Sequence, residues 1–481
     1  MMPKYSNLAD VQQDLNIGKI TLPDLVLFYL ENIKKTQDLN IYIEVFEAEA
    51  LAKAHLLQAK FEANPTSVGR LFGMVISLKD VICYANHKVT AGAKILEGFE
   101  SLFSATAVEK VLAEDAIIIG RVNCDQFAMG STNENTIYGP TRNAANPDKV
   151  PGGSSGASAV SVQADTCLAA LGTDTGGSVR QPASFCGIIG MKPTYGRVSR
   201  YGLLAYGSSF DQIGTLSHSV EDAALLLEIM AGQDDFDATS STLNVPSYTD
   251  FFKDKDKNQD KKSRIAYIET AVNHDGLDAD VKKLTWLTIE KLRSEGHLVE
   301  PVAFDILEYL IPAYYVLTTA EASTNLSRYD GVRFGYRNPD AKDLYETYTK
   351  SRTEGFSNEV KRRIMLGTFV LSAGYFDAYY AKAQKVRRLI QDRTREIFKD
   401  YDFILLPTSP TPAWNIGESL SDPVAMYLAD IFTVHANMAG IPAIALPIGE
   451  SEDGLPIGIQ FMADKFKEAE LLAFGKAFLE M

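Results

Sequence analysis

Cysteine and histidine are scarce in this chain of 481 residues, which has four cysteines and six histidines. The cysteines stand far apart and form no C-x-x-C pair, so we expect reduced packing residues of a cytoplasmic protein rather than a disulfide framework. They are Cys83, Cys124, Cys167 and Cys186. No run of about eighteen apolar residues occurs, and the first residues show no apolar segment typical of a secretory signal. We therefore expect no membrane association.

Positive charge is also limited. Lysine and arginine number 47 against 62 aspartates and glutamates, which gives a net charge of −15 at pH 7. Binding to nucleic-acid phosphates needs clustered lysine and arginine. We therefore do not expect this chain to hold a nucleic acid by itself, although a nucleic acid held by a partner is compatible with its charge.

Two familiar functional loops are missing. The chain has no G-x-S-x-G elbow. It also has no G-x-x-x-x-G-K-[ST] phosphate loop, because Lys192, which follows two nearby glycines, precedes Pro193. The second absence excludes a P-loop nucleotide site, and the first weakens a Ser-His-Asp interpretation without eliminating it.

A charged segment at about residues 253–262 interrupts the apolar pattern. Its Asp254, Asp256 and Asn258 alternate as in a calcium-binding EF-hand, but Gln259 and Ile265 stand where that loop needs glycine and glutamate. We interpret the segment as a solvated insertion loop, and we predict no metal site.

Strand-like and helical segments alternate along the chain. Apolar runs predict strands at residues 74–78, 116–119 and 166–171, with a helix between the first two. The first seventy residues or so are predicted to be mainly helical, with Thr21 as an N-cap and Pro23 in the first turn. The alternation predicts an α/β fold with a sheet covered on both faces. Because no internal repeat or Pro- or Ser-rich linker occurs, we expect one domain over residues 1–481.

Two serine-bearing glycine loops are the most informative feature that is present. Residues 152–156 read Gly-Gly-Ser-Ser-Gly, and residues 172–178 read Gly-Thr-Asp-Thr-Gly-Gly-Ser. The second loop can present backbone N–H groups of Thr175, Gly176 and Gly177 beside a nucleophile, as an oxyanion site requires. A plain turn or a phosphate loop would share this composition.

A serine nucleophile needs a base within hydrogen-bond reach. Histidine is the usual base, but none of the six histidines lies in either loop. Lys79 follows the apolar run 74–78, and burial there could bring its pKa from about 10.4 to about 7–8, so that a neutral amine is available. The alternative is a lysine at a strand end that extends to water.

The stretch from Pro151 to Arg180 resembles the amidase signature family. The resemblance implies a large mixed β-sheet with helices on both faces, and a Ser-cisSer-Lys triad of Ser178, Ser154 and Lys79. Ser178 would attack an amide carbonyl, and Ser154, after a cis peptide, would relay the proton to Lys79. Ammonia would leave, and water would then cleave the acyl-enzyme.

Three further segments resemble one branch of that family, the glutamine-hydrolysing subunits of tRNA-dependent amidotransferases. They are residues 120–135, 359–368 and 426–433. The resemblance implies a heterotrimer in which ammonia passes to a tRNA-binding kinase/transamidase subunit, beside a small third subunit. ATP and Mg²⁺ would act at that partner, which would convert Glu-tRNA(Gln) to Gln-tRNA(Gln) and make most of the tRNA contacts. No cofactor is implied in this chain.

Free glutamine carries an α-carboxylate and an α-ammonium, so its pocket should hold a base and an acid. By resemblance Arg363 pairs with the carboxylate, Asp430 pairs with the ammonium, and Tyr314 lines the pocket. Arg363 could instead lie on a solvated helix face, Asp430 could be a cap or an ion-pair partner, and Tyr314 could be a core residue.

Three hypotheses follow from these features. The first is a glutaminase subunit of a tRNA-dependent amidotransferase. The second is a free-standing hydrolase for small aryl, fatty or peptide amides, which would not need the Arg363 and Asp430 pair. The third is a catalytically silent scaffold that only binds a partner.

Overall fold

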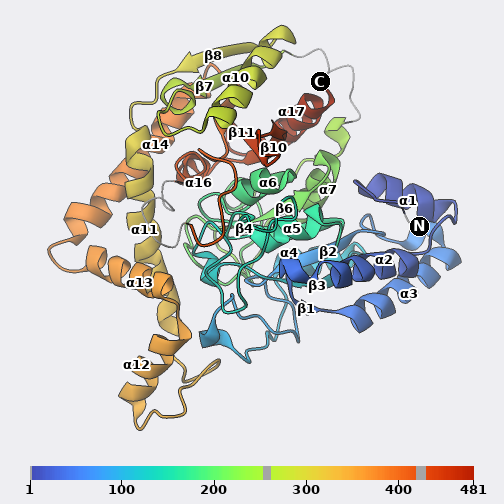
Figure 1. The fold of residues 1–481 in the computed structure, drawn as a ribbon, viewed down its shortest axis with the longest axis horizontal. Coiled ribbons are helices and arrows are strands. Elements are labelled where there is room, and N and C mark those ends of the chain that lie inside the picture. Colours follow the sequence, from blue (N-terminus) through green and yellow to red (C-terminus); the bar gives the residue numbers. More distant parts are fainter. Residues whose placement is uncertain (1–2, 253–261, 419–428) are drawn as a thin grey trace.

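An eleven-stranded sheet runs through the computed structural model, which describes residues 3–252, 262–418 and 429–481 (Figure 1). From one edge to the other its strands are β1 (Tyr42–Val45), β3 (Ile117–Val122), β2 (Val75–Lys79), β4 (Ala169–Asp174), β6 (Gln212–Ser217), β5 (Ile189–Lys192), β10 (Ala443–Glu450), β11 (Pro456–Ala463), β9 (Phe403–Pro407), β7 (Arg264–Ile268) and β8 (Leu298–Val302).

The sheet is mixed. Strand β2 runs parallel to both β3 and β4, and β7 runs parallel to both β8 and β9. The strands between these two groups pair antiparallel. All residues of β2, β3 and β4 are buried, as expected for parallel strands covered on both faces. The predicted α/β class with a large mixed sheet is confirmed.

Helices cover both faces of the sheet, as strand β10 shows. Gly190 of β5 pairs with Ala445 of β10, so these two residues face the same side. A Cβ placed on Gly190 would lie 2.6 Å from that of Ala183 in α6 (Arg180–Cys186). The neighbouring Ile444 faces the opposite side, where its Cδ1 would lie 3.3 Å from a Cβ on Gly475 of α17 (Glu468–Glu480). The two faces of this part of the sheet therefore pack on different helices.

The first seventy residues are mainly helical, as predicted. Thr21 caps α2 in a capping box with Asp24, and Pro23 lies in the first turn. Strand β1 is the exception, since it pairs antiparallel with β3 and joins this region to the sheet. Besides α6, the α-helices described in the N-terminal half are α1 (Leu8–Asn16), α2 (Leu22–Lys35), α3 (Glu47–Ala63), α4 (Thr106–Ala113), α5 (Gly156–Gln163) and α7 (Val220–Met230).

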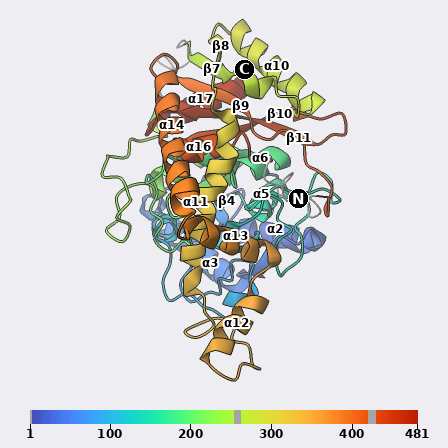
Figure 2. The ribbon, with the colours of Figure 1, turned by 90° about the vertical axis from the view of Figure 1, so that its left-hand side faces the viewer.

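A helical arm lies along one side of the sheet, opposite the N-terminal helices in Figure 1, and faces the viewer in Figure 2. It contains α11 (Leu310–Asn325), α12 (Leu344–Gly355), α13 (Asn358–Leu371), the π-helix η8 (Phe376–Ala381) and α14 (Lys382–Ile397). Between the arm and the sheet lies α16 (Val434–Ala439), while α9 (Glu269–Val272) and α10 (Ala279–Ser294) accompany β7 and β8.

The buried apolar residues form two large clusters. One joins the N-terminal helices to the central strands and includes Leu78 and Val179. The other lies beneath the arm and includes Tyr314, Tyr315 and Phe432. Leu78 and Val179 adjoin Lys79 and Ser178, and Phe432 lies within the third resembling segment, so both clusters reach the candidate site.

Two expectations fall wholly or partly outside the described residues. Of the charged insertion loop predicted at about 253–262, only Lys262 is described. In the third resembling segment, residues 426–428 lie outside the described part of the chain. Within the described part of the chain, no helix is long and apolar enough to cross a membrane.

Candidate active site

Lys79 is the last residue of β2 and is completely buried. Its Nζ lies 2.7 Å from Ser154 Oγ, 2.9 Å from Ser155 Oγ and 2.9 Å from Thr173 Oγ1. Burial lowers the pKa of Lys79 to about 8, because an ammonium loses its hydration inside the sheet. This burial excludes a Lys79 side chain that extends to water. With a pKa of about 8, a part of the Lys79 amine is neutral near pH 8.

The two loop serines beside Lys79 have different surroundings. The Ser155 hydroxyl donates to the Thr173 carbonyl at 3.1 Å and accepts the Thr173 N–H at 3.1 Å, which ties the first loop to β4. The peptide bond between Gly153 and Ser154 is cis, as the resemblance implied. Ser155 thus has a local structural role, and Ser154 is the better candidate for the proton relay.

Ser178 lies two residues before α6, at the end of the second loop. The Ser155 N–H donates to the Ser178 carbonyl at 3.2 Å, so the two loops are joined through their main chains. Ser178 is 8% exposed, whereas Ser154 and Lys79 have no exposed surface. Of the three residues in the expected triad, Ser178 is the one with exposed surface.

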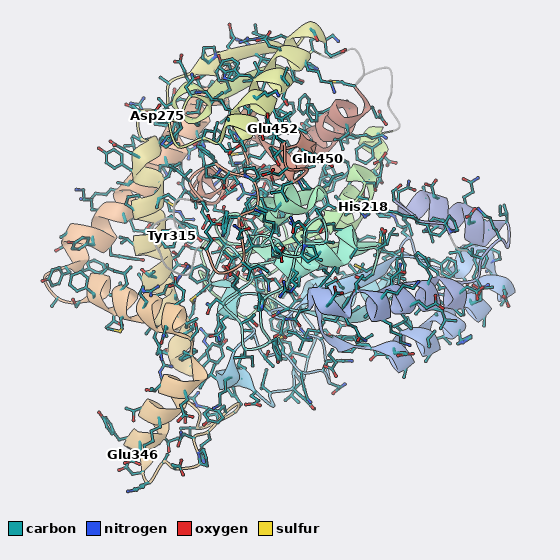
Figure 3. All side chains as sticks on the ribbon, in the orientation of Figure 1. His218, Asp275, Tyr315, Glu346, Glu450 and Glu452 are labelled. Atoms are coloured by element: carbon teal, nitrogen blue, oxygen red, sulfur yellow. The ribbon has the colours of Figure 1, made fainter. Side chains whose placement is uncertain are left out.

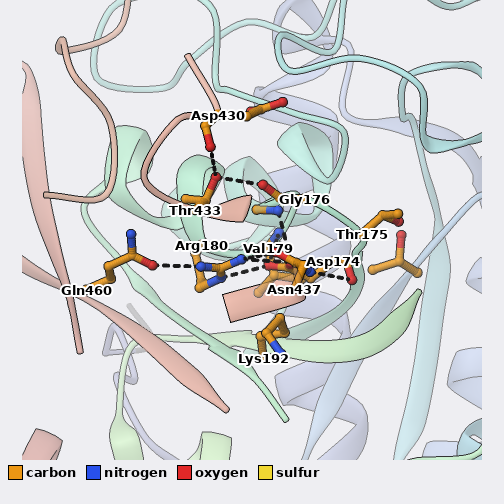
Figure 4. A network of polar contacts seen from close by, with 12 residues as sticks. Asp174, Thr175, Gly176, Val179, Arg180, Lys192, Asp430, Thr433, Asn437 and Gln460 are labelled. Carbon is orange, nitrogen blue, oxygen red and sulfur yellow. Dashed lines mark hydrogen bonds and ion pairs between the residues drawn. The ribbon is translucent and has the colours of Figure 1, made fainter. Parts of the chain in front are cut away.

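A buried carboxylate organises the second loop (Figure 4). Asp174, at the end of β4, accepts the N–H groups of Gly177 at 2.9 Å and Val179 at 3.2 Å. It also pairs with Arg180 at 3.1 Å and accepts the Asn437 amide at 2.8 Å. Burial alone would raise the pKa of Asp174, but the Arg180 guanidinium, the Lys192 charge and the Asn437 amide together hold that pKa at about 2. The loop therefore closes around a permanent negative charge.

The expected oxyanion segment is held from several sides. Thr175 Oγ1 donates to Asp211 at 2.6 Å, and Thr433 Oγ1 donates to the Gly176 carbonyl at 2.6 Å. Because the Gly177 N–H donates to Asp174, that amide serves the loop, and its part in the predicted oxyanion site is not supported. The amides of Thr175 and Gly176 stay as predicted donors.

Arg363 lies on α13 and is only 3% exposed, so a solvated helix face is excluded. Its guanidinium donates to Glu359 at 2.8 Å and to the Tyr206 hydroxyl at 2.8 Å. The rings of Tyr206 and Tyr315 have their centroids 5.5 and 5.3 Å from it, within the range of cation–π contact.

Asp430 faces the same group of side chains. Its carboxylate accepts the Ser131 hydroxyl at 3.0 Å and the Tyr315 hydroxyl at 3.2 Å. Burial raises the pKa of Asp430 to about 7, although both hydrogen bonds and the charge of Arg363 oppose this rise. In Figure 3 Tyr315 lies at α11, far from Glu346 at the outer end of α12. Tyr315 therefore links Arg363 to Asp430 at the inner part of the arm.

Tyr314 is both a core residue and a neighbour of the second loop. It belongs to the buried cluster beneath the arm, and a Cβ on Gly176 would collide with its hydroxyl group. Burial raises the pKa of Tyr314 well above its ordinary value, so the phenol stays protonated. Its hydroxyl hydrogen is therefore present beside the loop that ends on Ser178.

Histidine takes no part in these contacts. His435, which is fully buried, is bonded to Thr394 at 2.7 Å, and burial lowers its pKa to about 3. Burial therefore disfavours the protonated imidazole that His435 would become if it acted as a general base.

Sequence reasoning missed several residues that shape the site. They are Ser131, Ser155, Thr173, Asp174, Arg180, Tyr206, Asp211 and Thr433. Asp174 lies inside the second loop and Arg180 follows that loop by two residues, so this pair of opposite charges was a usable signal. Tyr206 and Asp211 lie far from every motif, and nothing in the sequence alone marks them.

Comparison with known proteins agrees with this geometry. A family model described as Amidase matches residues 24–472, and the chain belongs to this family. The chain is 50% identical to the A subunit of glutamyl-tRNA(Gln) amidotransferase from Chlorobium luteolum, over 98% of this chain and 96% of that protein. The protein of the same name from Chlorobaculum tepidum is 47% identical over 98% and 97%.

Solved structures extend the likeness. The crystal structure of the A subunit of glutamyl-tRNA(Gln) amidotransferase from Thermotoga maritima is 38% identical, with a TM-score of 0.76 over 95% of this chain and 94% of that one. The peptide amidase from Stenotrophomonas maltophilia is 26% identical, with a TM-score of 0.81 over 98% and 96%. The fold is therefore shared by amidases with different substrates.

Proposed function

We propose that this chain hydrolyses glutamine and supplies the ammonia with which a tRNA-dependent amidotransferase converts Glu-tRNA(Gln) to Gln-tRNA(Gln). The names of the full-length relatives support this assignment. The observation that carries it is the combination of a buried Lys79–Ser154 contact of 2.7 Å with an arginine and an aspartate, both buried, that share Tyr315.

Lys79 begins the reaction as a neutral amine. Such an amine has two N–H donors, which we assign to its contacts with Ser155 and Thr173, and one lone pair, which then faces the hydroxyl of Ser154. The lone pair takes the proton of Ser154, and Ser154 takes that of Ser178. Ser178 Oγ then forms a bond to the side-chain carbonyl carbon of glutamine.

The second half of the cycle reverses these proton transfers. The C–N bond breaks as the proton returns through Ser154 to the leaving nitrogen, which departs as ammonia. Water then attacks the acyl group on Ser178, its proton follows the same route, and glutamate is released. The N–H groups of Thr175 and Gly176 stabilise the oxyanion in both halves.

The pocket recognises both charged ends of glutamine. A guanidinium binds a carboxylate in bidentate geometry, and we assign this role to Arg363. Asp430 takes the α-ammonium, and because its pKa lies at about 7 an arriving cation favours its ionised form. Tyr314 closes the pocket over Gly176. An uncharged amide would gain nothing from these two residues, which favours glutamine over the free-standing amidase alternative.

The remaining chemistry belongs to partner subunits. The net charge of −15 favours tRNA contacts mainly through a kinase/transamidase partner, where ATP and Mg²⁺ would act. A small third subunit completes the assembly, and we place the complex in the cytoplasm. This chain needs no cofactor for its own half-reaction.

The test measures ammonia release from glutamine by the chain assembled with its partner subunits and Glu-tRNA(Gln). We expect release that is lost in Ser178→Ala, and a fluorophosphonate label on Ser178 by mass spectrometry. Labelling of Ser154 or Ser155 instead would overturn the nucleophile assignment. Hydrolysis of aryl amides but not of glutamine would favour the free-standing amidase, and unchanged Gln-tRNA(Gln) formation by Ser178→Ala would favour the scaffold.

A further inference from the structure

Thr433 contacts the nucleophile loop, although the reaction proposed above gives it no role. It is completely buried, and its hydroxyl donates to the Gly176 carbonyl at 2.6 Å (Figure 4). Its side chain also packs directly on the next residue, since a Cβ on Gly177 would collide with it. Gly177 has a φ of +130°, a conformation that side chains rarely allow. Thr433 and the loop are therefore fitted to each other without space between them.

The hydrogen bond from Thr433 holds one side of the peptide plane between Gly176 and Gly177. The Gly176 carbonyl and the Gly177 N–H belong to the same planar unit and point in opposite directions in a trans peptide. Thr433 holds the carbonyl, and Asp174 holds the N–H at 2.9 Å. The peptide that joins Gly176 to Gly177, one residue before the peptide that adjoins Ser178, is thus held at both ends by side chains from different parts of the chain.

The segment that carries Thr433 also carries the proposed ammonium ligand. The N–H groups of Thr433 and Val434 both donate to the Asp430 carbonyl at 3.1 Å, which forms the turn that leads into α16. Asn437, four residues after Thr433, donates to Asp174 at 2.8 Å and accepts from Arg180 at 2.7 Å. Residues at this spacing lie on one face of a helical segment.

We propose that Thr433 is a positioning residue that couples the ammonium site at Asp430 to the nucleophile loop by holding the Gly176 carbonyl. The coupling to glutamine rests on the function proposed above. One face of the segment that leads into α16 then carries three residues in a row: Asp430 faces the ligand, Thr433 holds Gly176 and Asn437 holds Asp174. Displacement of this face moves the peptide plane that Thr433 holds in the loop of Ser178, so its effect falls on the chemical step more than on binding.

The test compares Thr433→Val, which keeps the shape but removes the hydroxyl, with Thr433→Ser, which keeps the hydroxyl. We expect Thr433→Val to lower kcat for glutamine about 10- to 100-fold, the scale of a reacting group misplaced by about 1 Å, with KM changed little. Thr433→Ser should recover most of the lost kcat. The rate of fluorophosphonate labelling at Ser178 should follow kcat.

A matched control separates positioning from stability. Thr215 is buried in β6, and its hydroxyl has no hydrogen-bond partner in the described part of the chain. Thr215→Val should therefore leave kcat, KM and the labelling rate unchanged. Equal labelling rates in Thr433→Val and the parent chain, failure of Thr433→Ser to recover kcat, or a loss that follows only the melting temperature would each overturn the proposal. Because labelling does not require glutamine, this test remains informative if the proposed substrate is wrong.

Discussion

The reaction centre and the ligand pocket are built differently. Lys79 ends strand β2, Ser154 lies in the loop before α5, and neither has exposed surface. Arg363 and Asp430 lie on α13 and on the segment before α16, next to the cluster beneath the arm. The first group must hold a lysine without its proton, whereas the second must hold a carboxylate without its proton beside an arginine. Burial makes the first easier and the second harder.

This difference separates chemistry from specificity. In the proposed reaction, the sheet and the two glycine loops supply a nucleophile and a base that any amide could use. The helical arm and Asp430 supply charges that only a zwitterionic substrate needs. Substitutions in the two regions should therefore change different kinetic parameters.

The largest effect is expected at Lys79. Lys79→Met removes the base, and we expect kcat for glutamine to fall by about 10³- to 10⁴-fold, in the upper range for general-base catalysis. Lys79→Arg should be just as inactive, because a guanidinium stays protonated. Steady-state ammonia release measures both variants, with circular dichroism and melting temperature as checks of folding. Appreciable activity in Lys79→Arg would contradict a neutral base.

Arg363→Gln and Asp430→Asn should act mainly on glutamine binding. We expect kcat/KM for glutamine to fall about 10²-fold, because each substitution leaves one charged end of the bound glutamine without its partner in a buried pocket. Hydrolysis of a small uncharged amide should change little. Arg362→Gln is the matched control on the same helix, since Arg362 is half exposed and its removal leaves the bond of Arg363 to Glu359, the carboxylate that both arginines share. A loss of equal size for both amides would assign Arg363 and Asp430 to the reaction centre instead.

The reaction centre was easier to predict than the pocket. Both serines lie in short glycine motifs, and Lys79 ends an apolar strand, so local patterns made them candidates, and the family resemblance then gave their expected roles. The α/β class and the capped α2 helix followed from periodicity and turn chemistry in the same way. The pairing of β1 with β3 and the ion pair of Asp174 with Arg180 depend on which surfaces meet in three dimensions.

The pocket depends on long-range packing. Resemblance gave Arg363, Asp430 and Tyr314, but no pattern in the chain connects Tyr206 to Arg363 or Ser131 to Asp430, which are 157 and 299 residues apart. The same is true of Thr433 and Gly176, which are 257 residues apart. Side-chain contacts between distant segments are set by the assembled core and leave no local signature.

The pH dependence should show both regions in one profile. Asp430 must lose its proton to bind an ammonium, with a pKa at about 7, and Lys79 must lose its proton to act as a base, with a pKa at about 8. Since both deprotonated forms are the active ones, kcat/KM for glutamine should rise with pH between about 6 and 9. At the acidic end of the profile, the slope should correspond to the loss of two protons.

Asp430→Asn separates the two steps. This variant should lose the step near pH 7 and keep the one near pH 8, so that only one proton affects its profile. A profile for the parent chain that is flat between pH 6 and 9 would contradict the assignment of both groups. If Asp430→Asn kept both steps, the assignment of the step near pH 7 to Asp430 would be wrong, and that of the other step to Lys79 would stand.

The smallest effect is expected at Ser131, which tests how the pocket sets the charge of its carboxylate. Its hydrogen bond stabilises the ionised form and holds the pKa of Asp430 below the value that burial alone would give. Ser131→Ala should therefore move the lower step of the kcat/KM profile to higher pH and weaken glutamine binding by less than about tenfold at neutral pH, the scale of one such bond. The upper step belongs to Lys79 and should not move. In an Asp430→Asn background the same Ser131→Ala substitution should change neither step, because no carboxylate is left to titrate. If Ser131→Ala moved the upper step, the two regions would be coupled more closely than their separate positions in the fold imply.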